Sequence, residues 1–280
     1  MDLQVHTDKI FAGVEQLIIA AQKRVAVFVN AETTLLYWGI GNYINSEMKD
    51  TDVSGYGKQI LATLSQQLTQ SYGKGYTYTA LTRMCKVANT LDGQIIATVS
   101  QLLSWSHLIE LASIENETKR DFYTQLAIAE RWGVRQLRDK ADSMLFERSA
   151  IAAKPNDVIK QSLKHLKEEK VITPELVFKN SYILNFLNLP AGYSESDLEN
   201  ALISHLQEFI LELGTGFAFL ERQKRIPVDA VDYHLDLLFY HRKLKRLIAI
   251  DLKLGKFKPE YKAKMELYLG WLQKKRNAAG

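Results

Sequence analysis

At 280 residues the chain is long enough for two modest domains or one large one. Its composition, 46% hydrophobic and 24% charged, excludes an intrinsically disordered chain. No apolar run approaches the length of a transmembrane helix, and the N-terminus lacks the pattern of a signal peptide. The single cysteine, Cys85, excludes an intramolecular disulfide and a cysteine-based zinc site. We therefore expect a cytoplasmic protein that does not contact a membrane.

The net charge of +4 is distributed unevenly along the chain. Residues 221–280 hold fifteen Lys and Arg against seven Asp and Glu, whereas the other 220 residues hold twenty-one against twenty-five. A polyanionic partner would be attracted to the basic C-terminal part. Lysines on a solvated helix would give the same balance, so charge alone does not identify a partner.

The first half of the chain is predicted to be helical. Apolar residues recur at helical spacing over residues 8–48, 58–71 and 77–91, and further helices are predicted over 99–111, 117–132 and 137–148. Thr77 or Thr79 can cap the third of these helices. Gly39 and Gly41 weaken the first helix locally but can allow close packing against a neighbour.

The second and third predicted helices have the outline of a helix-turn-helix. Gly73-Lys74-Gly75 forms a sharp turn between them. Arg83 and Lys86 would lie on the outer face of the helix predicted over 77–91. Such elements bind DNA in some proteins, whereas many helical hairpins share the outline without contacting nucleic acid. Arg83 and Lys86 are therefore candidate nucleic-acid-binding residues.

A boundary between two domains is expected between about residues 150 and 190. Lys154-Pro155-Asn156 interrupts the helical pattern, residues 157–170 form a charged helix, and Thr173-Pro174 marks a second break. We therefore divide the chain into a helical N-terminal domain (1–150), a linker region (151–190) and a C-terminal domain (191–280).

The C-terminal domain is predicted to contain a helix, three strands and a final helix. Ser194 or Ser196 can cap the first helix, and Gly214 ends it. The strands are expected over residues 216–223, 233–240 and 246–254, and the last helix over 260–274. The short basic connection at 241–245 suits an antiparallel hairpin. The fold class of the whole chain is therefore α+β.

Two of these strands carry acidic residues among aliphatic neighbours. Asp236 lies in one of them, and Asp251 and Lys253 share a face of the next. A carboxylate in a buried strand is costly unless something neutralises it. Two aspartates and a lysine on one sheet face predict a site for Mg²⁺ or Mn²⁺, with the Leu252 carbonyl as a further ligand. The alternative is a surface salt bridge between Asp251 and Lys253. The apolar run 247–250 favours a central strand and therefore the metal site.

The same residues carry a resemblance to a known family. Asp236 followed by Asp251-Leu252-Lys253, on adjacent strands after a helix and a strand, matches the PD-(D/E)XK pattern of metal-dependent nucleases. The C-terminal part resembles the YhcG-like family of predicted nucleases, and the N-terminal half is similar to the helical domain of that family. The segments that carry the resemblance are LENALISHLQEFILELGTGFAFLERQ (198–223), YHLDLLFYHRKLKRLIAIDLKLGKFKPEY (233–261), KMELYL (264–269), LLYWGIGNYI (35–44), YGKQILATLS (56–65), LSWSHLIEL (103–111) and RWGVRQL (131–137).

The resemblance implies a helical N-terminal domain, for which a winged-helix-like fold is one alternative, joined to a restriction-endonuclease-like α/β core. It implies a Mg²⁺-dependent endonuclease that acts on DNA, with RNA as the other substrate class. Asp236, Asp251 and Lys253 match the catalytic positions of the superfamily, and the two aspartates match its metal ligands. Superfamily members often add a glutamate from the first core helix. Our choice for it is Glu199, with Glu208 and Glu212 as rivals.

Further polar residues near these strands are candidate contacts with nucleic acid. Gln223, at the end of the first predicted strand, and Lys256 are the two that we favour. Tyr268 and Lys262 on the last helix could also contact the phosphate backbone, although Tyr268 suits a core position better.

The chain departs from the superfamily pattern at its C-terminus. Superfamily members normally extend past the last helix with at least one more strand, whereas this chain stops at Gly280. We therefore expect a C-terminally truncated core, with an exposed sheet edge, lower stability or dependence on a partner. The alternatives to an active nuclease are a non-catalytic nucleic-acid-binding protein and an interaction module whose helical domain forms a homodimer or binds a partner protein.

Overall fold

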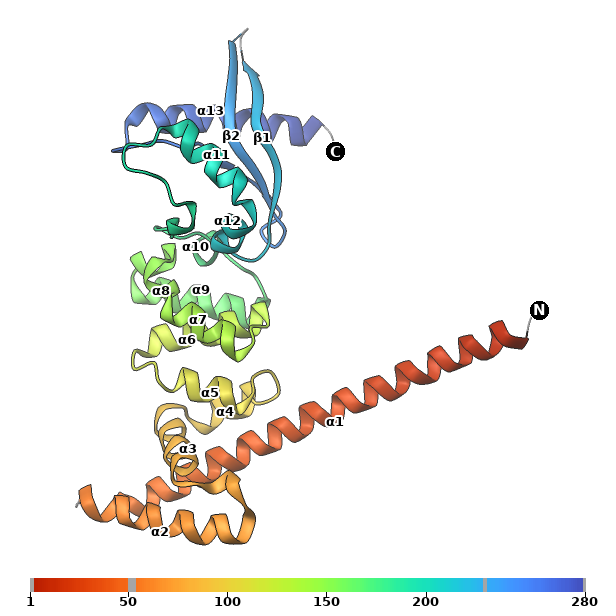
Figure 1. Cartoon of the computed structure of the whole chain (residues 1–280), viewed down its shortest axis with the longest axis vertical. Coiled ribbons are helices and arrows are strands. Elements are labelled where there is room, and N and C mark those ends of the chain that lie inside the picture. Colours follow the sequence, from red (N-terminus) through yellow and green to blue (C-terminus); the bar gives the residue numbers. More distant parts are fainter. Residues whose placement is uncertain (1–2, 50–53, 229–230, 279–280) are drawn as a thin grey trace. The chain divides into compact units, whose positions relative to one another are not determined.

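The computed structural model describes residues 3–49, 54–228 and 231–278, and it divides the chain into two compact units (Figure 1). The units are Met1–Ser143 and Met144–Gly280. Residues 151–190, predicted to be a linker region, lie in the second unit together with the sheet. The domain boundaries predicted from the sequence remain predictions.

Unit 1 is helical, as predicted. Its described residues, 3–49 and 54–143, include no strand, so they provide no β-hairpin of the kind that completes a winged helix. Its elements are α1 (Leu3–Met48), α2 (Ser54–Tyr72), the 3₁₀ helix η1 (Lys74–Tyr76), α3 (Tyr78–Thr90), α4 (Gly93–Val99), α5 (Trp105–Leu111), α6 (Glu117–Glu130) and α7 (Val134–Asp142).

The start predicted for the helix over 99–111 is wrong, because α4 ends at Val99 and the next helix, α5, begins at Trp105. Helix α5 begins only at Trp105, where Ser104 and His107 form a capping box. The Ser104 hydroxyl and the His107 Nδ1 atom are 2.7 Å apart, and the Ser104 N–H donates to the same Nδ1 atom at 3.1 Å. Such contacts supply partners to backbone N–H groups that have none at the start of a helix, so they favour a helix that begins here.

Helices α1 and α3 approach each other closely at Gly41. A Cβ atom at this position would lie 2.1 Å from the carbonyl oxygen of Met84, so only glycine permits the contact. One turn further along α1, the side chain of Asn45 donates to the carbonyl of Cys85 at 2.9 Å. A Cβ atom at Gly39 would meet no atom of the described residues within 4 Å, so close packing was predicted correctly for Gly41 and wrongly for Gly39.

The pair α2 and α3 forms the predicted helical hairpin. Gly73 takes a left-handed backbone conformation with φ 90°, and the Thr77 side chain caps α3 by accepting from Ala80 N. Arg83 and Lys86 lie on the exposed face of α3, as predicted. The hairpin is therefore present, while contact with nucleic acid stays a prediction.

From Ser194 onwards unit 2 has the predicted order of helical region, strand, strand, strand and helix. The helix predicted from Ser194 to Gly214 breaks at His205 into two, and the first strand continues through Pro227. The elements are α8 (Leu145–Arg148), η2 (Ala150–Ala153), α9 (Asn156–Glu169), α10 (Pro174–Val177), η3 (Asn185–Leu187), α11 (Glu195–Ser204), α12 (Leu206–Leu213), β1 (Phe217–Val228), β2 (Val231–His241), β3 (Arg246–Ile250) and α13 (Pro259–Ala278).

The three strands form one antiparallel sheet in the order β1-β2-β3. Strand β2 is therefore central, and β3 pairs with no second strand among the described residues. The predicted central position of residues 246–254 is wrong in this respect. Strand β3 also ends at Ile250, because carboxylates accept the next main-chain hydrogens in place of a strand. Leu252 N donates to Asp236, and Leu254 N donates to Glu195.

Helices cover both faces of the sheet. Successive side chains of β2 point to opposite faces, so the strand contributes to the core on each side. Leu237 and Phe239 pack against Leu202 of α11 and Phe209 of α12 on one face. On the other face Leu238 packs with Tyr268 and Leu272 of α13 and with Ile226 of β1. This two-sided core fixes β2, and Asp236 on it, between α11 and α12 on one side and α13 on the other (Figure 1).

Candidate functional site

A hydrogen bond joins Asp236 to the segment that carries Asp251 and Lys253. The Leu252 N–H donates to Asp236 Oδ2 at 2.7 Å. Because β2 and β3 are adjacent and antiparallel, with Leu237 opposite Ile250, the residue after Ile250 lies beside Asp236. The structure therefore brings together the three residues that the sequence singled out on these two segments.

Asp251 is buried between two lysines. Its side chain is 6% exposed, with Oδ2 3.2 Å from Lys253 Nζ and Oδ1 3.2 Å from Lys264 Nζ. Lys264 comes from α13, where it also lies over the ring of Tyr268, 5.3 Å from the centroid. The sequence analysis missed Lys264. The sequence could have indicated Lys264, because it lies four residues before Tyr268 and therefore on the helix face that meets the sheet.

Glu199 of α11 is connected to Asp236 through Gln223. Glu199 is 8% exposed and accepts hydrogen bonds from Arg222 Nε and, at 2.6 Å, from Gln223 Nε2. The same Gln223 nitrogen donates to Asp236 Oδ1 at 3.1 Å. One amide group therefore bridges two carboxylates that would otherwise repel each other.

The backbone at Gln223 supports this arrangement. Its φ of 50° lies in the left-handed region, which residues with a side chain rarely adopt. Such conformations persist where the surroundings over-determine them, and they cluster at functional sites. The two hydrogen bonds to Glu199 and Asp236 are the surroundings that hold Gln223 here.

The rivals of Glu199 lie in other environments. Glu208 is exposed to solvent. Glu212 pairs with Arg148 at 2.7 Å and with the buried Lys179 at 3.1 Å. Of the three glutamates proposed from the sequence, Glu199 is the one that hydrogen bonds join to Asp236.

The Lys253 ammonium lies where several oxygen atoms converge. It is 3.1 Å from Glu195 Oε2, 3.2 Å from Asp251 Oδ2 and 2.5 Å from the carbonyl oxygen of Leu252. Glu195 also accepts the Leu254 N–H at 3.1 Å. Glu195 was missed in the sequence because its position, directly after the Ser194 cap, is equally typical of an ordinary first helical turn.

Glu195 and Lys253 stabilise each other's charge, so both side chains are ionised. The N–H of Leu254 and the ammonium of Lys253 lower the pKa of the Glu195 carboxyl below its ordinary value. Burial favours the neutral form of Lys253, but its hydrogen bond to Glu195 and the charge of Asp251 outweigh this, so its pKa is raised. Lys253 is therefore a cation at neutral pH, suited to stabilising negative charge rather than to accepting a proton.

The residues present fit a hard divalent cation in the chemistry of their donors. Carboxylate and carbonyl oxygens are the ligands that Mg²⁺ and Mn²⁺ prefer, and Asp236, Asp251 and the Leu252 carbonyl supply them. The convergence of oxygens on the Lys253 ammonium shows that this environment favours positive charge. Within the described residues, however, no group of three or more His, Cys, Asp or Glu side chains is close enough to hold a metal ion.

The other residues predicted to contact nucleic acid are not part of this network. Lys256 is exposed in the segment that follows β3, and Arg83 and Lys86 lie in unit 1. Lys262 lies 3.7 Å from Glu266 on the solvated side of α13. Tyr268 is fully buried and donates to the carbonyl of His234 at 2.8 Å, so its predicted core position is confirmed.

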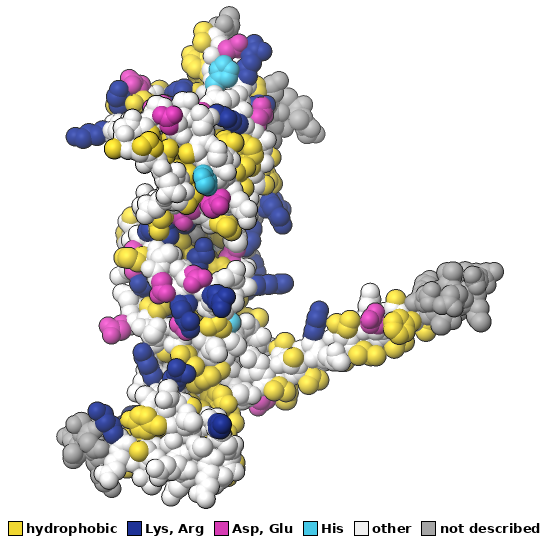
Figure 2. Space-filling view, in the orientation of Figure 1, with side chains coloured by type: hydrophobic (Ala, Val, Ile, Leu, Met, Phe, Trp, Pro, Cys, Tyr) yellow, Lys and Arg dark blue, Asp and Glu magenta, His cyan; other side chains and the backbone are white. Residues whose placement is uncertain are grey.

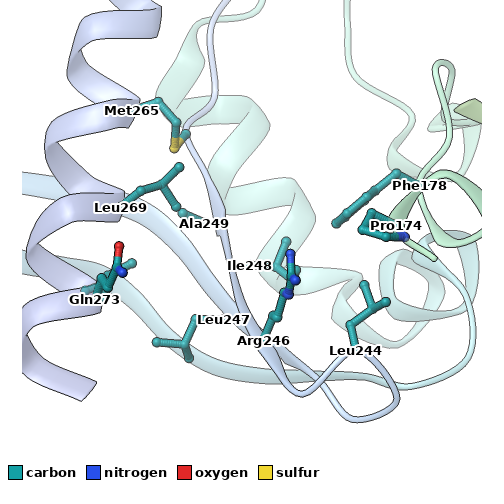
Figure 3. A pocket seen from close by; sticks show the side chains of 11 residues that line it. Pro174, Phe178, Leu244, Arg246, Leu247, Ile248, Ala249, Met265, Leu269 and Gln273 are labelled. Carbon is teal, nitrogen blue, oxygen red and sulfur yellow. The ribbon is translucent and has the colours of Figure 1, made fainter. Parts of the chain in front are cut away.

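A separate pocket of 660 Å³ lies between β3 and α13 (Figure 3). It is mostly apolar, and no carboxylate is among the described residues that line it. The lining consists of Pro174, Phe178, Leu244, Arg246, Leu247, Ile248, Ala249, Met265, Leu269, Leu272 and Gln273. Without an acidic group this pocket is unsuited to a divalent metal, and the polar network around Asp236 remains the candidate site.

Comparison with known proteins gives matches over both units. The family model described as "DUF1016 N-terminal domain" matches residues 13–148, and the one described as "YhcG PDDEXK nuclease domain" matches residues 175–279. A relative from Escherichia coli (strain K12), named "Putative nuclease YhcG", is 31% identical over 294 aligned residues, which cover 94% of this chain and 78% of the relative. No solved structure matches. None of the helices in the described part of the chain combines the length and the hydropathy that a membrane span requires.

Proposed function

Because the chain belongs to the YhcG family of PD-(D/E)XK nucleases, with a DUF1016 N-terminal domain, we propose that it is a Mg²⁺- or Mn²⁺-dependent endonuclease that hydrolyses phosphodiester bonds in DNA. The observation that carries this proposal is the hydrogen bond from Leu252 N to Asp236. It joins the acid of the central strand to the segment with Asp251 and Lys253.

Asp236 and Asp251, with the Leu252 carbonyl, would hold the metal ion. When bound, such an ion lowers the pKa of a coordinated water and screens the charge of a phosphate. The protein must hold the two aspartates near each other, although like charges repel. Gln223, Lys253 and Lys264 do so by donating hydrogen bonds or charge to their oxygens.

Lys253 would stabilise the negative charge that develops on the phosphate during attack. It suits this role because the pKa of its ammonium group is raised and because Glu195 restricts its position. Glu199 and Gln223 would act as positioning residues, since their contacts orient the Asp236 carboxylate.

The basic part of the chain would supply the contacts with the DNA backbone. Lys256 is exposed close in sequence to Lys253, and the surplus of Lys and Arg over residues 221–280 attracts a polyanion. Arg83 and Lys86, on the exposed face of α3, would add contacts from the helical unit. RNA offers the same phosphate chemistry and is the competing substrate class.

A plasmid-cleavage assay tests the proposal. We expect nicking of supercoiled DNA in Mg²⁺ or Mn²⁺ that EDTA abolishes, and loss of nicking in Asp251→Ala and Lys253→Ala. Lys160→Ala is the matched control, because this lysine of α9 is exposed and is not among the residues predicted to contact nucleic acid. Cleavage that is independent of metal, or that both site variants retain, would exclude the mechanism. A parallel assay on single- and double-stranded RNA distinguishes the substrate classes.

The second candidate function is non-catalytic nucleic-acid binding. One observation favours it: both oxygens of Asp251 already lie beside lysine ammonium groups, which neutralise the charge that would attract a metal. This function predicts DNA binding that weakens steeply with salt and survives Asp236→Ala, since that change removes no phosphate contact. Binding of this kind, together with no cleavage in any divalent metal, would favour it over the nuclease.

A further inference from the structure

The N-terminal half of α1 is an apolar helix that no described residue of its own unit covers. From Ile10 to Val29 every residue is exposed except Ala21, which is partly exposed. Phe11, Leu17 and Phe28 are 67%, 72% and 65% exposed. Figure 2 shows hydrophobic side chains along this part of the helix. Directly after this part, Asn30 joins α1 to the rest of unit 1, because its side chain donates to the carbonyls of Ser100 and Leu103 at 2.9 and 3.2 Å.

Part of this arm, residues 10–29 of α1, has the spacing of a coiled-coil seam. Six apolar residues follow one another at intervals of three and four positions, which places them along one stripe of the helix. At a rise of about 1.5 Å per residue the stripe is about 26 Å long. We call this stripe the seam, and its residues are Phe11, Val14, Ile18, Ala21, Val25 and Phe28.

We propose that this seam pairs with the seam of a second copy of the chain, in antiparallel orientation, to form a homodimer. The order of side chains supports the second copy as the occupant. Read from either end, the seam has phenylalanine first and valine second, and its two central residues are Ile18 and Ala21. An antiparallel pair centred between Ile19 and Ala20 therefore places Phe11 level with the partner's Phe28, Val14 with the partner's Val25 and Ile18 with the partner's Ala21.

The charges of the arm select the same orientation. Glu15, Lys23 and Arg24 are its charged residues, with the acid towards one end of the seam and the bases towards the other. In the antiparallel pair Glu15 lies at the same level along the axis as the partner's Arg24, so the acidic end of each arm lies alongside the basic end of the other. A parallel pair would place identical charges level with each other, which is unfavourable near an apolar seam.

The oligomeric state of the full-length chain tests the proposal. We expect light scattering coupled to gel filtration to give a dimer for the natural chain and a monomer for Ile18→Glu, which puts two carboxylates into the seam. Ile19→Glu is the matched control, since the same change one residue along lies about 100° around the helix. It should remain a dimer. Circular dichroism checks that both variants keep their helices. A monomeric natural chain, or equal behaviour of the two variants, would overturn the proposal.

Cysteine crosslinking tests the orientation. In a Cys85→Ser background, Phe11→Cys and Phe28→Cys chains should form an interchain disulfide when mixed and oxidised, whereas neither chain should crosslink by itself. Crosslinking within Phe11→Cys alone would show a parallel pair and overturn the orientation. Recruitment of a monomeric natural chain to phosphatidylcholine vesicles would replace the second copy by a lipid surface and overturn the dimer.

Discussion

Leu252 donates its main-chain N–H to Asp236 Oδ2 at 2.7 Å, at the point where β3 has ended. A neighbouring strand would normally accept this hydrogen bond. Here a side chain of the central strand accepts it, so the position of the segment 251–254 depends on the same carboxylate that is proposed to bind the metal. Asp236 therefore has two roles, holding the segment 251–254 in place and, as proposed, binding the metal. Substitutions at Asp236 can distinguish the two.

Asp236→Asn and Asp236→Ala should differ in stability but not in activity. Asparagine keeps an oxygen that can accept from Leu252 N, whereas alanine leaves that N–H without its partner, at a cost of about 1–3 kcal/mol in the free energy of unfolding. Both changes remove the charge of a metal ligand, so cleavage should fall at least about 100-fold in each. Urea denaturation and plasmid nicking provide the two measurements. Full activity in the asparagine variant would contradict the metal-binding role.

Lys264→Met should make the chain more dependent on divalent metal for its stability. Asp251 is 6% exposed and would lose one of its two cationic neighbours. Because Lys264 is itself a third exposed, solvent screens the pair, and we expect a loss of about 1 kcal/mol without metal. A bound Mg²⁺ would supply the missing charge, so it should raise the urea midpoint of this variant more than that of the natural chain. Lys262→Met is the control, and an equal response to Mg²⁺ in all three chains would contradict the prediction.

The sequence was sufficient to predict the order of elements from Ser194 onwards and that Asp236, Asp251 and Lys253 lie close together. Alternating apolar residues identify strands, and an acid inside such a pattern is conspicuous because its burial is costly. Glu195 and Lys264 were missed for the opposite reason. An acid in a first helical turn and a lysine on an amphipathic helix are ordinary features, and only the folded chain brings them beside Lys253 and Asp251.

The end of β3 could not be predicted from local pattern either. The residues 251–254 continue the alternation of the strand, and their departure from it depends on acceptors far away in the sequence. Asp236 accepts from Leu252, and Glu195 from Leu254. The exposed edge position of β3 likewise depends on which strands are present beside it, which the apolar run 247–250 does not specify.

Glu212→Gln should weaken unit 2 at neutral pH and have little effect in acid. Burial alone would raise the pKa of Glu212, but hydrogen bonds from Ile183 N, Arg148 and Lys179 lower it below the ordinary value. A lowered pKa in the folded chain stabilises it above the pKa of the unfolded chain, and this contribution is lost as the pH falls through the folded pKa. The difference in urea midpoint between the natural and variant chains should therefore be present at pH 7 and shrink below about pH 4. A constant difference across this range would show that the charge of Glu212 does not contribute.

Gly41→Ala and Gly39→Ala should shift stability in opposite directions, although the two residues are close neighbours on α1. A methyl group at position 41 would lie 2.1 Å from Met84 O, which belongs to the backbone of α3 and cannot move aside as a side chain would. The two helices must separate, which disturbs the Asn45–Cys85 contact, and we expect a loss of about 1–3 kcal/mol. A methyl group at position 39 would have no atom of the described chain within 4 Å, so alanine should stabilise the helix by up to about 1 kcal/mol. Thermal unfolding followed by circular dichroism measures both. Equal effects of the two substitutions would show that α1 and α3 do not approach each other at Gly41.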